Sequence, residues 1–331
     1  MTHERLSKGS MEQPHEQKVP ASRASRPLNI TRRQFLQTAA AASCGLSLSA
    51  FGQVIPPKAG TVRDKLWLFS NPTNADYGLL RKRSVMSPFE AAVYMGIPNI
   101  FMVQQYPGKG EESWYKPWEP PFEPYTLPLS MLKRVAWSIV GASGVTKDWE
   151  RKQVLSMAHR TPNFVGVYMD DFFHDKRGPE VASLTLDQLR DIQRQIKGPD
   201  KKMDLYVTFY AHQLDLPIAE HLKLIDVITL WIWKPEELAD LDSHLAKLDK
   251  LAPHSRKMLG LYTVALNDKK TPGWTGMPIP LMQKQCEQAL GWLRSGRIEG
   301  IIIYGGTTFD LEFEAVDWTR EWIRKVGQTK L

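Results

Sequence analysis

Short apolar runs separated by helical patterns recur along this chain, and this repeat constrains the fold more than any other feature. Each run is six to eight residues long and almost entirely apolar, which is typical of parallel strands covered on both faces. There are eight such runs, over residues 65–70, 99–105, 134–140, 164–170, 204–210, 226–233, 257–264 and 300–305.

Helical patterns lie between these runs, and two of them begin with a capping box. Ser87 can cap a helix with Pro88 at its first position and Glu90 two residues later, ending near residue 96. Thr185 opens a second helix that ends near Gly198. Further helices are expected over residues 146–159, 234–251 and 280–294. A last helix, capped by Asp317, is expected to end at residue 326.

Eight strand–helix repeats predict an α/β fold, a (β/α)₈ TIM barrel that forms a single domain. The alternative is a doubly wound open sheet, which would need a Gly-rich phosphate turn after the first strand. Residues 71–74 read Asn-Pro-Thr-Asn and do not form such a turn. Residues 107–129, rich in Pro, Glu, Trp and Tyr, are expected to form a long loop after the second strand.

The N-terminal part of the chain contains a pair of arginines, Arg32 and Arg33, within the run Thr-Arg-Arg-Gln-Phe-Leu-Gln. A mildly apolar stretch rich in Ala, Ser and Leu follows, and no charge occurs until Lys58. The run resembles the bacterial twin-arginine signal pattern, with Gln37 in place of the usual lysine. Such signals are addresses that a receptor reads and not membrane anchors.

This resemblance implies a disordered extension and a twin-arginine signal peptide over residues 1–52, followed by the barrel over residues 53–331. It also implies binding to the twin-arginine translocase during export and a periplasmic or secreted protein. The apolar stretch is too short for a stable membrane span. An amphipathic helix and a lipid anchor on Cys44 are the alternatives for this segment.

The net charge changes when this segment is removed. Residues 1–52 hold seven Lys and Arg and three Asp and Glu, so they contribute +4 of the formal net charge of +7. The remaining charge of about +3 forms no concentrated basic stripe, which argues against a nucleic-acid partner. Cys286 would then be the one remaining cysteine, and it is expected to be a small core residue. The histidines show no metal-ligand spacing, so neither a metal nor a cofactor is expected.

Polar and aromatic side chains stand where the predicted strands end, which is where the functional site of such a barrel lies. Sugars have apolar CH faces that stack on aromatic rings and hydroxyl groups that need polar partners, so this rim suits a carbohydrate. The expected substrate-binding residues are Asn71, Gln104, Tyr106, Trp137, Tyr210, His212, Trp231, Trp233, Tyr262, Asn267, Asp268 and Tyr304.

Two adjacent acids, Asp170 and Asp171, end the fourth apolar run and are followed by two phenylalanines. Burial and a neighbouring like charge both disfavour ionisation of a carboxyl group. One of the two acids can therefore stay protonated near neutral pH while the other is charged. Glycoside hydrolysis needs this division of roles between two carboxyl groups.

The segment over residues 168–175 resembles barrel N-acetylglucosaminidases of the O-GlcNAc hydrolase and hyaluronidase-like type, in which the acetamide of the substrate is the nucleophile. The resemblance implies that Asp170 polarises the acetamide and that Asp171 protonates the leaving oxygen. It also implies that Tyr210 supports the acetamide and that Asn267 or Asp268 holds sugar hydroxyls.

Other barrel glycosidases pair an aspartate on the fourth strand with an acid on a later strand, and Asp310 is the candidate for that partner. The leading hypothesis is thus an exported glycoside hydrolase. A non-catalytic carbohydrate-binding or cell-envelope protein on the same barrel is the alternative, with Asp170 and Asp171 capping a turn. A third possibility is a metal-dependent hydrolase that uses Asp170, His212 and Asp310.

Two of the site predictions have a purely structural alternative. His212 can be a hydrogen-bonded structural histidine. Trp231 and Trp233, two residues apart on one strand, can fill the barrel or form a sugar platform.

Overall fold

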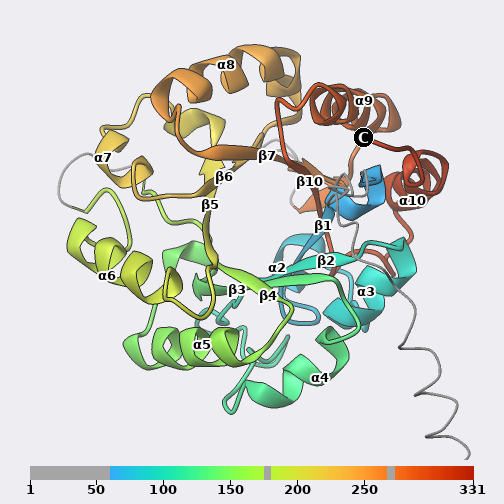
Figure 1. Ribbon diagram of the computed structural model, residues 1–331. Coiled ribbons are helices and arrows are strands. Elements are labelled where there is room, and N and C mark those ends of the chain that lie inside the picture. Colours follow the sequence, from blue (N-terminus) through green and yellow to red (C-terminus); the bar gives the residue numbers. More distant parts are fainter. Residues whose placement is uncertain (1–59, 175–179, 267–272) are drawn as a thin grey trace, which may run out of the picture. The chain divides into compact units, whose positions relative to one another are not determined.

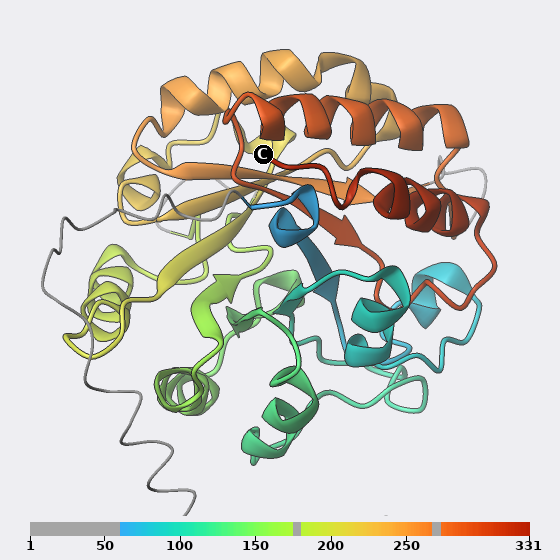
Figure 2. The ribbon, with the colours of Figure 1, turned by 45° about the vertical axis from the view of Figure 1, so that its right-hand side comes forward.

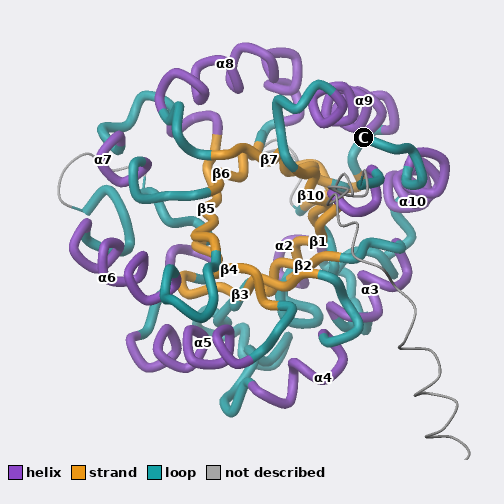
Figure 3. The backbone as a smooth tube through the Cα atoms, viewed as in Figure 1, coloured by secondary structure: helices purple, strands orange, loops and turns teal. Residues whose placement is uncertain are grey.

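Eight parallel strands close into one barrel, in the order β1-β10-β7-β6-β5-β4-β3-β2. The computed structural model describes residues 60–174, 180–266 and 273–331. Figures 1 and 3 show the ring of strands with the helices arranged around it. The predicted (β/α)₈ barrel is therefore confirmed, and the doubly wound open sheet is wrong. The predicted signal segment and its boundary at residue 53 lie outside the described residues.

All eight predicted runs form strands of the barrel. Two of these strands have the predicted bounds at both ends, and the bounds of the other six differ from the prediction by up to three residues. A small antiparallel pair after β7, β8 (Val264–Leu266) with β9 (Trp274–Gly276), was not expected. The barrel strands are β1 (Leu66–Ser70), β2 (Asn99–Met102), β3 (Arg134–Val140), β4 (Phe164–Met169), β5 (Asp204–Tyr210), β6 (Val227–Trp231), β7 (Arg256–Tyr262) and β10 (Gly300–Tyr304).

The helices form the outer layer of the barrel, which the turned view of Figure 2 shows from another side. None of the helices in the described part of the chain is both long and apolar enough to cross a membrane. The helices are α2 (Tyr77–Leu80), α3 (Pro88–Met95), α4 (Thr126–Leu129), α5 (Asp148–Arg160), α6 (Leu186–Ile196), α7 (Ala219–Leu222), α8 (Leu241–Leu251), α9 (Ile279–Arg294) and α10 (Glu314–Val326).

The predicted helix starts are confirmed at α3 and α6 and wrong at α10. Ser87 and Thr185 both make the predicted capping boxes. The helix α10 starts at Glu314, so Asp317 lies in its first turn and does not cap it. The region before α8 forms a 3₁₀ helix, η5 (Pro235–Asp240), and the predicted long loop contains a second one, η2 (Glu123–Tyr125), followed by α4.

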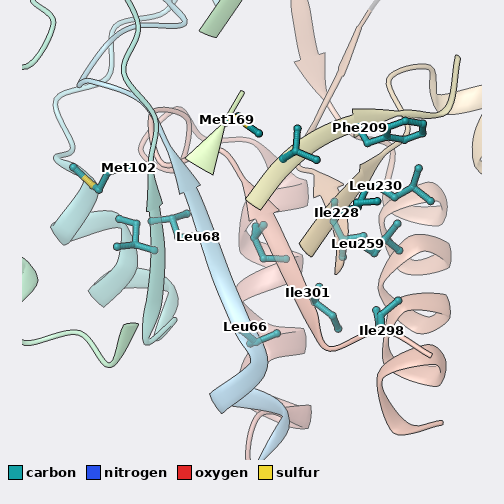
Figure 4. Close-up of a cluster of buried hydrophobic side chains, with 14 of the residues drawn as sticks. Leu66, Leu68, Met102, Met169, Phe209, Ile228, Leu230, Leu259, Ile298 and Ile301 are labelled. Carbon is teal, nitrogen blue, oxygen red and sulfur yellow. The ribbon is translucent and has the colours of Figure 1, made fainter. Parts of the chain in front are cut away.

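Along most of the strands the buried hydrophobic residues alternate between two clusters, because side chains alternate between the faces of a strand. The outer cluster is mainly aliphatic and packs under the helices, as Figure 4 shows for Leu66, Leu68, Met169 and Ile301. The inner cluster fills the barrel and is unusually aromatic. It includes Trp67, Phe69, Phe101, Tyr168, Tyr206, Tyr210, Trp231 and Tyr304.

Glycines on neighbouring strands leave the space that these large rings occupy. A Cβ atom on Gly260 of β7 would lie 2.1 Å from the ring of Trp231 on β6. A Cβ atom on Gly166 of β4 would lie 2.5 Å from the ring of Tyr206 on β5. The small residues therefore allow two bulky side chains to lie across the barrel interior.

Replacing Gly260→Ala is expected to lower the free energy of unfolding by about 1–3 kcal/mol, because the added methyl group overpacks the barrel against Trp231. Gly291→Ala is the matched control, since a Cβ atom there meets nothing within 4 Å. That change is expected to raise the same free energy by about 0.5–1 kcal/mol, because alanine favours a helix over glycine. Urea unfolding measures both, and a Gly260→Ala variant as stable as wild type would contradict this packing.

Candidate functional site

A cavity of about 170 Å³ lies at the C-terminal ends of the barrel strands. It is lined by side chains from most of the strand ends, and eight of the predicted site residues are among them. Those eight are Asn71, Asp170, Asp171, Tyr210, Trp231, Trp233, Tyr262 and Tyr304. The remaining lining residues are Phe69, Asp76, Leu79, Gln105, Ala142, Ser143, Thr208 and Trp274.

Asp170 is buried in the wall of this cavity, with only 4% of its surface exposed. Its Oδ1 accepts a hydrogen bond of 2.6 Å from the hydroxyl of Thr208 on β5. Burial, and then the negative charge of Asp171, raise the pKa of Asp170 well above its ordinary value, although the bond from Thr208 opposes this shift. The environment therefore favours the protonated form of Asp170.

The oxygens of Asp171 both accept hydrogen bonds inside the protein. Oδ1 accepts one of 2.6 Å from the hydroxyl of Tyr210, and Oδ2 accepts one of 2.7 Å from the backbone N–H of Ser143. Neighbouring side chains of a strand point to opposite faces, but Asp171 has φ 43°, in the left-handed region. The chain therefore turns at this residue, and both carboxyl groups line the same cavity.

A second and larger hollow of about 520 Å³ adjoins the first. The two share Ser143, Asp171, Tyr210 and Trp233, so the carboxyl group of Asp171 lies at their junction. His212 lies in this second hollow, where its ring stacks on that of Tyr210 with centroids 5.5 Å apart. The hollow continues toward Phe173, His174, Gln213, Lys234 and Glu237.

The two tryptophans of the β6 region differ in exposure. Trp231 is 1% exposed and fills the barrel, and its Nε1 donates to the hydroxyl of Thr229 at 2.9 Å. Trp233 is 37% exposed and lines both hollows. Of these two rings, Trp233 is thus the one with a face that a ligand can stack on.

Three residues predicted to bind substrate lie outside both hollows. Gln104 forms two hydrogen bonds with the backbone of Trp118 and so holds the long loop, while its neighbour Gln105 lines the cavity. Tyr106 donates to the carboxylate of Glu150 at 2.6 Å. Trp137 belongs to the outer cluster, because its position on β3 alternates with those that face the barrel interior. The structure thus does not bring these three residues to the two hollows.

Asp310 is also absent from the lining of the cavity. Its Oδ2 accepts a hydrogen bond of 2.7 Å from the backbone N–H of Val85, so it holds a loop rather than facing Asp170. Among the described residues no group of three His, Cys, Asp or Glu side chains is arranged to hold a metal ion. Asn267 and Asp268 lie outside the described residues.

The prediction of site residues omitted Ser143, Thr208 and Trp274, all of which line the cavity. Thr208 could have been found, because it lies two residues from Tyr210 on the same strand and shares its face. Trp274 lies on the unexpected strand β9, so it does not follow from strand periodicity. Ser143 contributes its backbone N–H, which no sequence pattern marks.

No family model matches the chain, and no curated protein matches its sequence. Solved structures are similar to most of the chain. A GH18 chitinase from Cycas revoluta in complex with (GlcNAc)₃ is 11% identical with a TM-score of 0.49, over 78% of this chain and 99% of that one. Active domain 2 of a thermostable chitinase from Pyrococcus furiosus is 14% identical with a TM-score of 0.47, over 75% and 85%. A riboflavin lyase is 10% identical with a TM-score of 0.45, over 80% and 92%. At such identities and scores these likenesses carry no argument about function.

The raised pKa of Asp170 predicts a pH-dependent gain in stability for Asp170→Asn. An aspartate in an unfolded chain has a pKa of about 3.9, so wild type loses stability as the pH rises from there through the higher pKa of the folded state. The asparagine variant has no such loss. The difference in unfolding free energy between variant and wild type should thus increase from pH 4 to pH 7 in urea titrations.

The variant Asp191→Asn controls for the loss of one carboxyl group, because Asp191 is exposed on α6. A difference between Asp170→Asn and wild type that stays the same at every pH would show that Asp170 ionises as readily in the folded chain as in the unfolded one.

Proposed function

We propose that this chain is an exported glycoside hydrolase in which Asp170 and Asp171 divide the acid and charge-stabilising roles. The observation that carries the proposal is the position of the Asp171 carboxyl group at the junction of the two hollows, beside the buried Asp170. A glycosidic bond between a sugar in the cavity and a leaving group in the second hollow would pass directly beside Asp171.

The lining of the cavity suits a sugar ring. Its volume of about 170 Å³ is of the order of a single pyranose, and its walls carry seven aromatic side chains together with polar groups. The half-exposed Trp233 offers a stacking surface that continues from the cavity into the second hollow.

The ionisation of Asp170 depends on the charge of its neighbour Asp171. The charge of Asp171 is one of the causes that raise the pKa of Asp170, so a proton taken up by Asp171 makes ionisation of Asp170 easier. In the reactive form Asp171 carries the proton and delivers it to the leaving oxygen. Asp170 is then charged and stabilises the positive charge that develops on the sugar or on its acetamide.

A non-catalytic carbohydrate-binding protein is the second candidate. It is favoured by the hydrogen bonds of Asp171, because both of its oxygens already have donors within the protein. Such a protein would bind sugars at the same cavity without cleaving them.

Replacing Asp171→Asn should lower kcat by about 10²- to 10⁴-fold, the usual effect of removing a general acid or base. The measurement is release of 4-nitrophenol from a panel of aryl glycosides that includes β-N-acetylglucosaminides and β-glucosides. Asp191→Asn serves as the surface control and should retain wild-type kcat. A wild-type chain that binds sugars but cleaves no glycoside of the panel would favour the non-catalytic candidate, and full activity of Asp171→Asn would refute its assigned role.

Export by the twin-arginine pathway predicts that the double change Arg32→Lys and Arg33→Lys keeps the protein in the cytoplasm, because the receptor reads the arginine pair. The measurement is fractionation of periplasm and cytoplasm in a bacterial host with an active twin-arginine translocase. Changing Arg23→Lys and Arg26→Lys, which precede the motif, is the matched control. Unchanged export of the Arg32 and Arg33 variant would contradict the proposed address.

A further inference from the structure

A third acid, Asp76, lines the same cavity from a different side of the barrel. It follows β1, whereas Asp170 and Asp171 follow β4, and the strands β2 and β3 separate the two along the shorter way round. Asp76 is only 3% exposed. Its side chain does not cap α2, although it occupies the N-cap position of that helix.

Among the described residues, hydrogen-bond donors reach only one of the two carboxyl oxygens of Asp76. Its Oδ2 accepts hydrogen bonds from the hydroxyl groups of Tyr304, at 3.0 Å, and Thr307. No residue that the structure describes donates to its Oδ1. Because Asp76 is buried and lines the cavity, the free oxygen is available to a molecule that occupies the cavity.

The charge of the cavity limits what such a molecule can be. Asp76, Asp170 and Asp171 all line it, and within the described ranges no lysine, arginine or histidine does. A carboxylate on the sugar would lose its hydration, meet these acids and find no cation among the described residues to pair with. A hydroxyl group would instead satisfy the free oxygen of Asp76.

We infer that Asp76 is a specificity-determining residue, which hydrogen-bonds a hydroxyl group of an uncharged sugar and makes the cavity reject uronic acids. The inference rests on the proposed function for the location of the sugar.

The first experiment compares 4-nitrophenyl glucosides, galactosides and N-acetylglucosaminides with the corresponding uronides. The wild-type chain should cleave its best neutral substrate at least about 100-fold more efficiently, in kcat/KM, than the matching uronide. An equal or higher kcat/KM for a uronide would overturn the inference while leaving the proposed hydrolase in place.

The second experiment compares Asp76→Asn with Asp76→Ala. In Asp76→Asn the introduced amide would accept from Tyr304 and Thr307 through its oxygen and donate into the cavity through its nitrogen, so kcat/KM should stay within about 10-fold of wild type. Asp76→Ala removes every one of these bonds and should lower kcat/KM by about 100-fold or more. Loss in Asp76→Ala without rescue in Asp76→Asn would overturn the hydrogen-bonding role.

Monodeoxy analogues of the best substrate separate recognition from a structural effect. The analogue that lacks the recognised hydroxyl should be a poor substrate for wild type, but Asp76→Ala should treat it and the parent sugar alike. If Asp76→Ala instead lowers kcat/KM by the same factor for the parent sugar and for every analogue, the role of Asp76 is purely structural. That result would overturn the inference.

Binding distinguishes failure of the inference from failure of the proposed function. Quenching of tryptophan fluorescence by glucose, N-acetylglucosamine and glucuronate reports on the cavity directly, because Trp231, Trp233 and Trp274 line it. A chain that cleaves nothing but binds the neutral sugars, and loses this binding in Asp76→Ala, would refute the hydrolase and support the inference. Binding of glucuronate as tight as that of glucose would overturn the inference in either case.

Discussion

The alternation of strand residues between the barrel interior and the helical layer sets which strand side chains reach the mouth of this barrel. On β5, Tyr206, Thr208 and Tyr210 share the inner face. Tyr206 lies deep in the barrel, in the space that Gly166 leaves. Thr208 and Tyr210, the next two residues on that face, donate hydrogen bonds to Asp170 and Asp171. The aromatic interior is thus continuous with the site, and the packing that closes the barrel also sets the positions of the hydroxyl groups that hold the acids.

Each of the three acids that line the cavity accepts a hydrogen bond from a hydroxyl group, and no cation of the described residues is paired with them. Thr208 donates to Asp170, Tyr210 to Asp171, and Tyr304 with Thr307 to Asp76. A cation would stabilise only the charged form of a carboxyl group. A hydroxyl group can donate to the charged form and accept from the protonated form. This arrangement suits acids whose protonation changes during a reaction, and it leaves the cavity without a fixed positive charge among the described residues.

The barrel was predictable because its strands are buried on both faces and therefore stand out as continuous apolar runs. The site was predictable only in part. Asp170 and Asp171 stand out because they end such a run. The outward position of Trp137 on β3 shows only when that residue is compared with the inward positions of the strand. Asp310 and Asp76 lie on loops beyond the strands, where no periodicity tells which acid faces the cavity, and the structure places Asp76 there.

The left-handed backbone at Asp171 limits which side chains this position can carry. Asparagine, aspartate and glycine adopt such a conformation more readily than glutamate or any branched residue. The codons for asparagine and glycine are each one nucleotide away from those for aspartate. A single base change could therefore remove the charge from the junction of the two hollows and leave the turn intact, so that a cleaving protein and a purely sugar-binding descendant would share the same loop.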